Sequence, residues 1–378
     1  MRFERVVVIG VGLIGGSIAA AARRLQPAPQ VVGISRSAKT LDFALENGVV
    51  DRAVQADDPK VDDVLAGGLE TLVVIATPVS AIGDWLCRLR DARFSGVVTD
   101  VASTKSAVIS AAEQCLGSRA AFVGGHPMAG SERSGVEAAR SDLLHGAYYV
   151  LTPSADTNMD AYRRVHAFVT ALGARVISVD ADDHDQAVAV ISHVPHVTAS
   201  ALVDVAASHS GPQGELMRLA AGGFKDTTRI AAGSPDLWTG ICLDNANAVA
   251  QGIDELREVL GEFAHMVRTH DADAVRDWLA RAADVRRSLP AQWVPASERL
   301  TELLVPVIDR PGVISEVTTA VGRTGCNIEA IEIDHQSEDT AVLVLVLTDE
   351  GDVDRLIDDL TDRGYEPRLR PLEHDGEV

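Results

Sequence analysis

The chain is poor in aromatic residues and in positive charge. Phe, Trp and Tyr make up 4% of its 378 residues, and 34 Lys and Arg stand against 55 Asp and Glu, which gives a formal net charge of -21. Proteins bind nucleic acids and anionic membranes through clusters of Lys and Arg. We therefore expect neither as a partner, and an anionic substrate would need a local concentration of positive charge.

Cysteines are few and far apart. Cys87, Cys115, Cys242 and Cys326 contain no Cys-x-x-Cys pair. Such spacing predicts neither a disulfide framework nor a thiolate zinc site. The sequence thus favours a reducing cytoplasm as the location, and no metal is expected.

Long apolar runs are also scarce. The uncharged segment 6–22 has the charged flanks of a signal peptide, but the glycines within it are spaced as in a turn. No later stretch approaches the roughly 20 apolar residues that span a bilayer. The sequence therefore predicts no membrane segment.

The composition is that of a globular protein with more than one core. The hydrophobic fraction is 46% and the charged fraction 24%. The first half alternates short β-branched runs with amphipathic helical patterns, which predicts a Rossmann-like α/β domain, a parallel sheet with helices on both faces. We expect this dinucleotide-binding domain over 1–180, with strands at 5–10, 30–35, 71–77, 96–102, 120–125, 147–153 and 174–180.

The rest of the chain divides into a helical part and a small mixed part. Over 181–290 the helical patterns have apolar faces that one sheet cannot bury, which predicts an all-α domain that packs on a second copy as a homodimer. The segment PAQWVPAS supplies two prolines and predicts a linker at 291–299. Residues 300–372 give strand, helix, strand, strand, helix, strand, a βαββαβ module of the ferredoxin-like type.

The segment VIGVGLIGGS predicts a nucleotide site. Gly10, Gly12 and Gly15 form Gly-x-Gly-x-x-Gly between an apolar strand and a helix-forming segment. The first glycine permits a tight turn, the second lets the backbone approach a pyrophosphate, and the third lets helix pack on strand. We predict that this loop, with Leu13 and Ile14, binds a dinucleotide.

The end of the second strand bears on the choice of cofactor. NAD-specific sites usually carry Asp or Glu there for the ribose 2′-hydroxyl, whereas this chain has Ser35 and Arg36. A hydroxyl and a guanidinium suit a 2′-phosphate. The sequence predicts that NADP+ is accepted, does not exclude NAD+, and leaves open that Arg36 stacks on adenine or lies in solvent.

Residues that follow the strands should line one rim, because ligands of open α/β sheets gather at the carboxyl ends of the strands. In GGHPMAGSERSG, Pro127 favours an extended conformation for His126. We expect this side chain to project from a loop as a neutral imidazole with an ordinary pKa of about 6.5, ready to accept a hydroxyl proton during hydride transfer. The other rim residues are Ser35 with Arg36, Thr77 with Pro78, and Ser103 with Lys105.

Two clusters lie in the helical half. GGFKDTTRIA places Lys225, Asp226 and Arg229 within one turn, where they could bind a substrate carboxylate or form a surface ion pair. SHVPH places His193 and His196 three residues apart, without further ligands for zinc in the sequence. We include Lys225, Asp226 and Arg229 in the expected substrate site.

Taken in order, the motifs resemble those of one enzyme family. VIGVGLIGGS, TDVASTK, GGHPMAGSERSG, SHVPH, GGFKDTTRIA and PDLWTGICLDNAN, over about residues 5–285, are similar to the prephenate dehydrogenases of tyrosine biosynthesis. The C-terminal IDRPGVI and CNIEAIEI resemble an ACT domain, a regulatory unit that commonly binds amino acids. The resemblance implies oxidative decarboxylation of prephenate to 4-hydroxyphenylpyruvate with hydride transfer to NAD(P)+.

Three alternatives stay open. The first alternative is an arogenate, or cyclohexadienyl, dehydrogenase, because relatives of this family accept arogenate. A β-hydroxyacid dehydrogenase is the second and fits less well, because those enzymes use a lysine base on a helix of the second domain. A nucleotide-sensing protein without catalysis is the third, and it would leave the histidine and the Lys225 to Arg229 cluster without a role.

The resemblance also implies individual roles. His126 matches the histidine that accepts a hydrogen bond from the ring hydroxyl and helps remove its proton, and Ser103 matches its supporting serine. The substrate-binding arginine corresponds to Arg229, the gating acid to Glu132, and the histidine near the pyruvyl side chain to His196.

The ACT-like module has an expected regulatory site at the loop after its first strand and at the start of its second. We predict feedback binding of tyrosine or phenylalanine there, with a dimerisation module that binds no ligand as the alternative. The residues are Asp309, Arg310, Pro311, Gly312, Asn327 and Ile328.

Overall fold

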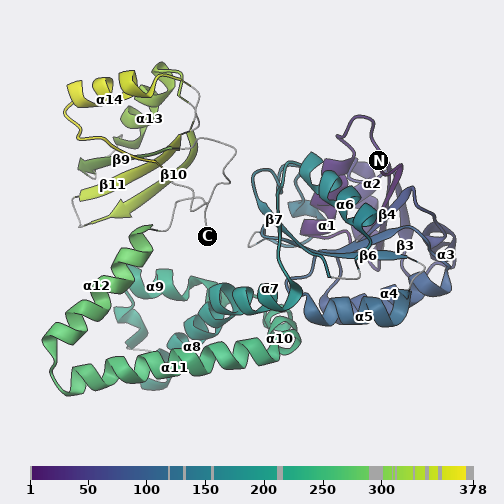
Figure 1. Ribbon diagram of the computed structural model, residues 1–378, viewed down its shortest axis with the longest axis horizontal. Helices are drawn as coiled ribbons and strands as arrows, with labels where there is room; N and C mark the ends of the chain where they lie inside the picture. The colour runs from purple at the N-terminus through teal and green to yellow at the C-terminus, as the bar shows by residue number, and fades with distance from the viewer. Residues whose placement is uncertain are drawn as a thin grey trace. The chain divides into compact units, whose positions relative to one another are not determined.

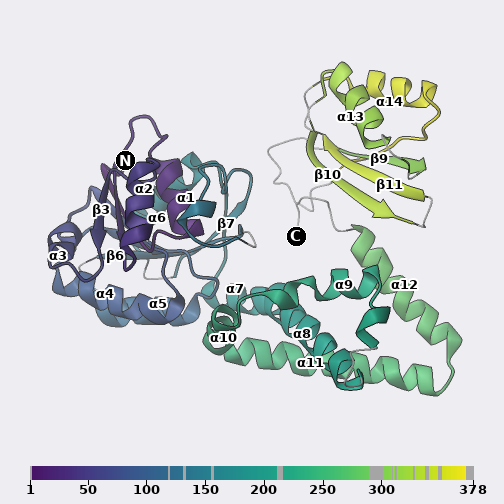
Figure 2. The ribbon, with the colours of Figure 1, turned by 180° about the vertical axis from the view of Figure 1, so that it is seen from behind.

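The computed structural model divides into two compact units, Met1–Val259 and Leu260–Val378. Figures 1 and 2 show the sheet and helices of each unit from opposite sides. The structure describes residues 2–117, 120–130, 133–154, 157–210, 216–288, 301–308, 310, 313–326, 328–336, 340–347 and 351–371.

The first unit is built on an 8-stranded sheet in the order β3-β2-β1-β4-β5-β6-β7-β8. Strands β1 to β6 run parallel, β7 runs antiparallel to β6, and β8 runs parallel to β7. The strands are β1 Arg5–Ile9, β2 Gln30–Ser35, β3 Arg52–Gln55, β4 Thr71–Ile75, β5 Val97–Asp100, β6 Ala121–Pro127, β7 Tyr148–Thr152 and β8 Arg175–Ser178.

The predicted Rossmann-like domain is confirmed, with two differences in its sheet. The parallel prediction is wrong at β7, because the described residues between β6 and β7 hold only the short turn η2, Val136–Ala138, and antiparallel strands need no crossover helix. Strand β3 was not predicted, because its sequence RAVQ is short, polar and at the sheet edge.

Helices cover both faces of the sheet (Figure 1). One core lies under α1, α2 and α6, around side chains such as Ile18, Leu41 and Val165, and the other lies under α3, α4 and α5. Caps define some of the helix starts: Ser37 accepts from the Thr40 N–H at 3.2 Å at the start of α2. The bounds are α1 Leu13–Ala22, α2 Ala38–Glu46, α3 Lys60–Leu65, η1 Val79–Ala81, α4 Ile82–Asp91, α5 Ser106–Leu116 and α6 Met159–Ala171.

The helical part begins with one continuous run in three pieces. Helix α7, Ala181–Val188, passes through a π turn, Ala189–His193, into α8, Val194–His209. Pro195 lies in the first turn of α8, where the missing N–H costs little. The remaining elements are η4 Leu216–Leu219, α9 Gly222–Thr228, η5 Arg229–Ala232, α10 Pro235–Asp244, α11 Ala246–Arg268 and α12 Ala272–Ser288.

The run Ala181–His209 corrects the expectation about apolar stretches. It has 29 residues and a window of mean hydropathy 1.4, which is long and apolar enough to cross a membrane by length and composition, and 33% of that window is buried. Alanine and valine raise the mean hydropathy of this run, which contains no block of large apolar residues. The apolar character of the run was therefore not recognised in the sequence. The run also carries buried His184, Asp185 and His193, whose hydrogen bonds to protein groups are more typical of a docked helix than of a lipid-facing one.

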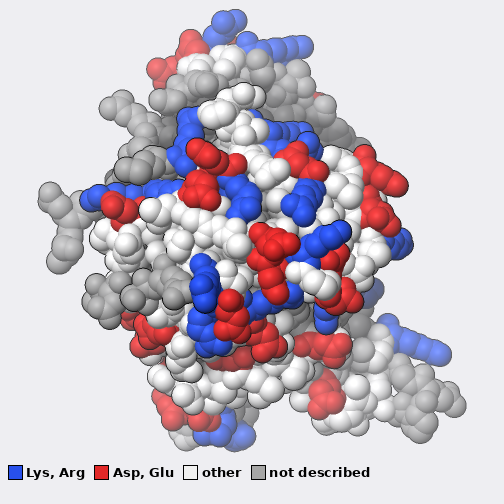
Figure 3. Space-filling model, turned by 90° about the vertical axis from the view of Figure 1, so that its right-hand side faces the viewer, with Lys and Arg blue, Asp and Glu red and all other residues white. Residues whose placement is uncertain are grey.

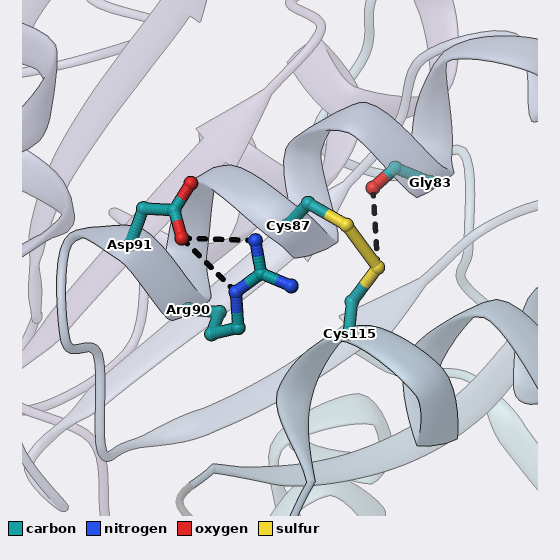
Figure 4. The surroundings of a disulfide bond; sticks show 5 residues. All are labelled: Gly83, Cys87, Arg90, Asp91 and Cys115. Atoms are coloured by element: carbon teal, nitrogen blue, oxygen red, sulfur yellow. Dashed lines mark hydrogen bonds and ion pairs between the residues drawn. A yellow bond between two sulfur atoms is a disulfide. The ribbon is translucent and has the colours of Figure 1, made fainter.

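The cysteine prediction is also wrong. Cys87 on α4 and Cys115 on α5 form a disulfide with a Cα separation of 4.9 Å (Figure 4). The two residues are 28 apart in sequence, but the adjacent packing of α4 and α5 brings them together. Spacing along the chain gives no information on such a contact between neighbouring helices. Cys242 and Cys326 are free.

The second unit contains the predicted βαββαβ module. Its four strands form an antiparallel sheet in the order β10-β11-β9-β12, and α13 and α14 pack on it around Val317, Leu343 and Leu356. The bounds are β9 Thr301–Ile308, α13 Val313–Arg323, β10 Ile328–His335, β11 Thr340–Leu347, α14 Val353–Asp362 and β12 Arg368–Pro371.

The surface carries both signs of charge. Figure 3 shows Lys and Arg side chains interspersed with Asp and Glu over one face, without a broad basic area on it. With a net charge of -21, long-range attraction of anions is weak, so an anion-binding site depends on a few local cations.

Candidate active site

The glycine loop has the geometry that a dinucleotide site needs. Gly10 has φ +97°, a left-handed conformation that favours glycine, and any Cβ there would meet the Ala76 carbonyl. A Cβ on Gly15 would meet the Gly10 carbonyl, whereas Gly12 has open space around it. Helix α1 starts at Leu13, so its first backbone N–H groups lie directly after the loop.

A cavity of about 900 Å³ opens beside this loop. It lies where the strand order reverses between β1 and β4, which is the usual ligand position in an open α/β sheet. Thr77 follows β4 and lines the cavity, and its buried Oγ1 has no hydrogen-bond partner among the described residues. The lining includes Gly10, Gly12, Ser35, Arg36, Thr77, Pro78, Asp84 and Trp85.

These observations fit a dinucleotide. A backbone open at Gly12 suits a pyrophosphate, and the unpaired Thr77 hydroxyl suits a polar ligand group. Arg36 is exposed and lines the same cavity, where a guanidinium can reach a phosphate. Of the residues predicted from sequence, Leu13, Ile14 and Gly15 support the loop from α1 and do not line the cavity.

A second cavity, of about 890 Å³, lies at the other end of the strands. Its lining includes Glu70, Gly96 and Ala121, which stand at the amino ends of β4, β5 and β6. Ligands of open α/β sheets bind at the carboxyl ends, so this cavity is not part of the candidate site.

A buried ion pair holds the carboxyl end of β5 against β6. The Lys105 ammonium contacts the Asp100 carboxylate and donates to the Gly125 carbonyl at 2.7 Å. Asp100 also accepts from the N–H groups of Ala102 at 2.9 Å and Gly125 at 3.0 Å. Burial lowers the pKa of Lys105, and the Asp100 charge opposes that effect. This network positions the residue that follows Gly125, which is His126.

His126 lies within strand β6 rather than on a loop. The strand extends to Pro127, and His126 pairs with Val150 of β7, which the sequence did not show because the antiparallel strand was not foreseen. Its Nδ1 lies 2.9 Å from Nε2 of His184. Burial and the positive charge of Lys105 lower the pKa of His126 to about 3, which corrects the ordinary value expected from the sequence. The ring is therefore neutral at physiological pH.

His184 and Asp185 were missed by the sequence analysis. They lie at the start of the helical part, on α7, and both are buried. His184 Nδ1 lies 2.8 Å from Asp185 Oδ1, and Asp185 also accepts from the backbone N–H of Lys105 at 2.7 Å and of Ser106 at 2.8 Å. Burial alone would raise the pKa of Asp185, but these hydrogen bonds outweigh it and lower the pKa. The His-Asp pair within DDHD was the signal, but its burial could not be read from the sequence.

An aromatic and imidazole cluster continues along the same helical run. Asn245 bonds the Asp185 carbonyl at 2.7 Å and lies 3.3 Å from His193 Nδ1. His196 stacks on Trp238 at a centroid distance of 3.5 Å, and His193 meets the edge of the same ring at 6.2 Å. Burial lowers the pKa of both histidines, so both favour the neutral state.

The structure brings some predicted substrate residues together and not others. His196 Nδ1 is buried and has no hydrogen-bond partner among the described residues, and the ring lies beside Gly233, which follows η5 and Arg229. Lys225 and Asp226 are exposed on α9, and Arg229 is exposed at the start of η5. Ser103 follows β5 and is partly buried.

Several predicted residues fall where the structure gives no description. Glu132 lies outside the described residues, as do Asp309, Pro311, Gly312 and Asn327. Of the remaining regulatory residues, Arg310 pairs with Glu316 at 2.6 Å, and Ile328 begins β10.

Together, the glycine loop, the cavity at the reversal of strand order and the imidazole of His126 at the carboxyl end of β6 are the features of a nicotinamide-dependent oxidoreductase of the Rossmann type. The family is given by comparison. Residues 18–178 match the nucleotide-binding domain of prephenate dehydrogenase, 180–281 match its dimerization domain, and 301–364 match the ACT domain. The chain belongs to the prephenate dehydrogenase family and carries a C-terminal ACT domain.

Individual relatives agree with this assignment. The prephenate dehydrogenase of Bacillus subtilis (strain 168) is 36% identical over 342 residues, which cover 89% of this chain and 90% of that protein. The crystal structure of prephenate dehydrogenase from A. aeolicus, in complex with hydroxyphenyl propionate and NAD+, has a TM-score of 0.71 at 30% identity and covers 76% of this chain and 98% of that one. Synechocystis arogenate dehydrogenase has a TM-score of 0.65 at 30% identity over 75% and 99% of the two chains.

Proposed function

We propose that the chain oxidises prephenate to 4-hydroxyphenylpyruvate in tyrosine biosynthesis, with release of CO2 and hydride transfer to NAD(P)+. The observation that carries this proposal is the position of His126 on β6, directly after Gly125 and the buried Lys105–Asp100 pair, in a chain of this family with an intact dinucleotide loop. A neutral imidazole can accept the proton of the ring hydroxyl.

The residues of the chain divide the work as follows. NAD(P)+, when bound, supplies the hydride acceptor. His126 takes the hydroxyl proton as hydride leaves C4 for the cofactor. The electrons of the bond between the ring and the departing carboxylate enter the ring as CO2 leaves, which makes the ring aromatic, and His126 then returns the proton to the ring oxygen to give the phenol of the product. Ser103 supports the ring hydroxyl beside His126. Because His126 sits on a paired strand, its position changes little as the proton moves.

Recognition of the substrate falls to the helical part. Prephenate carries two carboxylates, and Arg229 with Lys225 are local cations in a strongly acidic chain. A guanidinium can bind a carboxylate through two parallel hydrogen bonds. We place the pyruvyl side chain near His196, whose buried Nδ1 lacks a partner among the described residues and whose ring is held by Trp238. Glu132 and Asp226 complete the proposed substrate site.

The choice of cofactor follows from Ser35 and Arg36. Both line the cavity at the end of β2, and neither carries the negative charge that repels a 2′-phosphate. We propose that NADP+ is accepted alongside NAD+. We propose that Gly10, Gly12, Gly15, Thr77 and Pro78 belong to the same dinucleotide site.

The remaining proposals concern assembly and control. The run Ala181–His209 exposes Val190, Ile191, Leu202 and Val205, apolar surface that a second copy would cover in a homodimer. We propose that the protein is a soluble cytoplasmic dimer. We divide each chain into a dinucleotide-binding domain at 1–180, a helical domain at 181–290, a linker at 291–299 and the ACT domain at 300–372. The ACT domain would bind tyrosine or phenylalanine through the loop and strand start around Arg310 and Ile328.

One assay tests the proposed function. NAD(P)H formation is followed at 340 nm, roughly the nicotinamide band, with prephenate and with arogenate, each with NAD+ and with NADP+. We expect turnover with prephenate and CO2 release equal to NAD(P)H formed. If only arogenate is turned over, arogenate replaces prephenate as the proposed substrate. If no combination of substrate and cofactor gives turnover, the proposed function is refuted.

A further inference from the structure

We propose that His184 and Asp185 are positioning residues that hold His126 in one tautomer, with its proton on Nδ1 and with Nε2 left to accept the proton of the substrate hydroxyl. This inference rests on the proposed function, which makes His126 the proton acceptor. It assigns a role to two residues of α7 that lie outside the substrate site described above.

The argument starts at the Asp185 carboxylate. Its Oδ1 accepts from the Lys105 N–H at 2.7 Å and its Oδ2 from the Ser106 N–H at 2.8 Å. Backbone N–H groups only donate, and the side chain is 7% exposed, so the site is built for an ionised carboxylate. An ionised carboxylate can only accept. His184 Nδ1, 2.8 Å from Oδ1, must therefore carry the proton of that hydrogen bond.

The next step follows from the chemistry of imidazole. A neutral ring has one N–H and one lone pair, so a proton on Nδ1 of His184 leaves its Nε2 as an acceptor. That Nε2 lies 2.9 Å from Nδ1 of His126. When His184 is neutral, the hydrogen bond between the two rings needs one donor, and only Nδ1–H of His126 can supply it. The lone pair of His126 is then on Nε2, the nitrogen turned away from His184.

Burial lowers the pKa of His126 and so favours its neutral form, and the charge of Lys105 adds to that effect. The groups that face His126 are Lys105 from the segment after β5, His184 and Asp185 from α7, and His193 from the π turn. Lys105 disfavours a second proton on His126, and Asp185 favours one.

The sheet and helix α7 of the first unit meet at this hydrogen bond, which explains why its geometry is specific. His126 belongs to the sheet, whereas His184 and Asp185 belong to the first helix of the helical part. Asp185 docks on the N–H groups at the start of α5, next to Lys105. A purely structural role of Asp185 would need only these backbone bonds. The bond through His184 adds the orientation of the base.

The test measures the tautomer directly in the full-length protein. With 15N-labelled histidine, long-range 1H–15N spectra distinguish N–H from unprotonated ring nitrogens, and the His126 signals are identified by their loss in His126→Asn. We expect Nδ1 protonated and Nε2 unprotonated for His126 at pH 7.5, roughly one unit above an ordinary imidazole pKa. A proton on Nε2 of His126 in the wild type would overturn the proposal.

Kinetics of two variants supply the second readout. His184→Phe keeps a planar aromatic side chain but removes both ring nitrogens, so we expect kcat to fall about 10- to 100-fold with KM within about threefold, and His126 to show a mixture of tautomers. Asp185→Asn should give the same mixture, because an amide can donate to His184 and reverse its tautomer. His166→Phe, on the nucleotide-domain helix α6, is the matched control and should leave kcat unchanged.

The outcomes separate this inference from the proposed function. A folded His184→Phe protein with wild-type kcat and an unchanged His126 tautomer would overturn the positioning role. If His184→Phe does not fold, the wild-type spectrum decides alone. A wild type without turnover on prephenate or arogenate would refute the proposed function, while the spectrum would still report the tautomer.

Discussion

The disulfide between Cys87 and Cys115 makes a quantitative prediction about stability. A cross-link restricts the unfolded chain, and for the 28-residue separation the chain-entropy relation gives a contribution of about 3.6 kcal/mol at 25 °C. Because the contribution comes from the cross-link, reduction of the bond by dithiothreitol should remove it. We expect Cys115→Ser to lower the free energy of unfolding by about 3 to 4 kcal/mol.

Urea unfolding followed by circular dichroism, with and without dithiothreitol, measures this. Dithiothreitol should lower the free energy of unfolding of the wild type to about that of Cys115→Ser. It should leave the free energy of unfolding of Cys115→Ser unchanged. Cys242→Ser, which removes a free thiol, is the control. A thiol titration of the denatured, unreduced protein should find the two free cysteines, Cys242 and Cys326. Four reactive thiols, or a wild-type midpoint insensitive to reductant, would refute the reasoning.

Three further predictions concern the site. His126→Asn should lower kcat about 100-fold or more with little change in KM, because a proton acceptor is lost, and near-normal turnover would remove its role. Arg229→Ala should raise the KM for prephenate, whereas Arg163→Ala on the exposed side of α6 should not; equal KM values would exclude Arg229 from binding. Burial alone would raise the pKa of Asp185, but accepted hydrogen bonds lower it below the unfolded value, so its stabilising effect is present above about pH 4 and is lost as the pH falls through the folded pKa. The difference in stability between wild type and Asp185→Asn should therefore shrink in acid, and a difference that grows there would contradict this assignment.

Much of the fold could be predicted because its signals are local. The β-branched runs of β1 and β4, the glycine loop after Ile9 and the strand order of the ACT-like module all follow from short-range patterns. The antiparallel direction of β7 could not be predicted, because the residue pattern of a strand is the same whether it pairs parallel or antiparallel. Its direction depends on the connection that precedes it.

The site was predicted in part for the same reason. His126 could be selected because its glycine and proline neighbours are unusual, but its pKa could not, since burial and the charge of Lys105 come from residues distant in sequence. His184 and Asp185 are ordinary polar residues in a helical pattern, and only the docking of α7 on α5 reveals their role. The disulfide likewise depends on packing between helices.

The π turn at Ala189–His193 separates two tasks along a single helix. One additional residue in that turn offsets the downstream half by about 100° relative to an uninterrupted α-helix. The half before it meets the proton acceptor, and the half after it presents His196 to Trp238. With His126 as the proposed base and His196 in the proposed substrate site, substitutions after the turn would change substrate choice and leave the base in place, so the two properties could diverge separately.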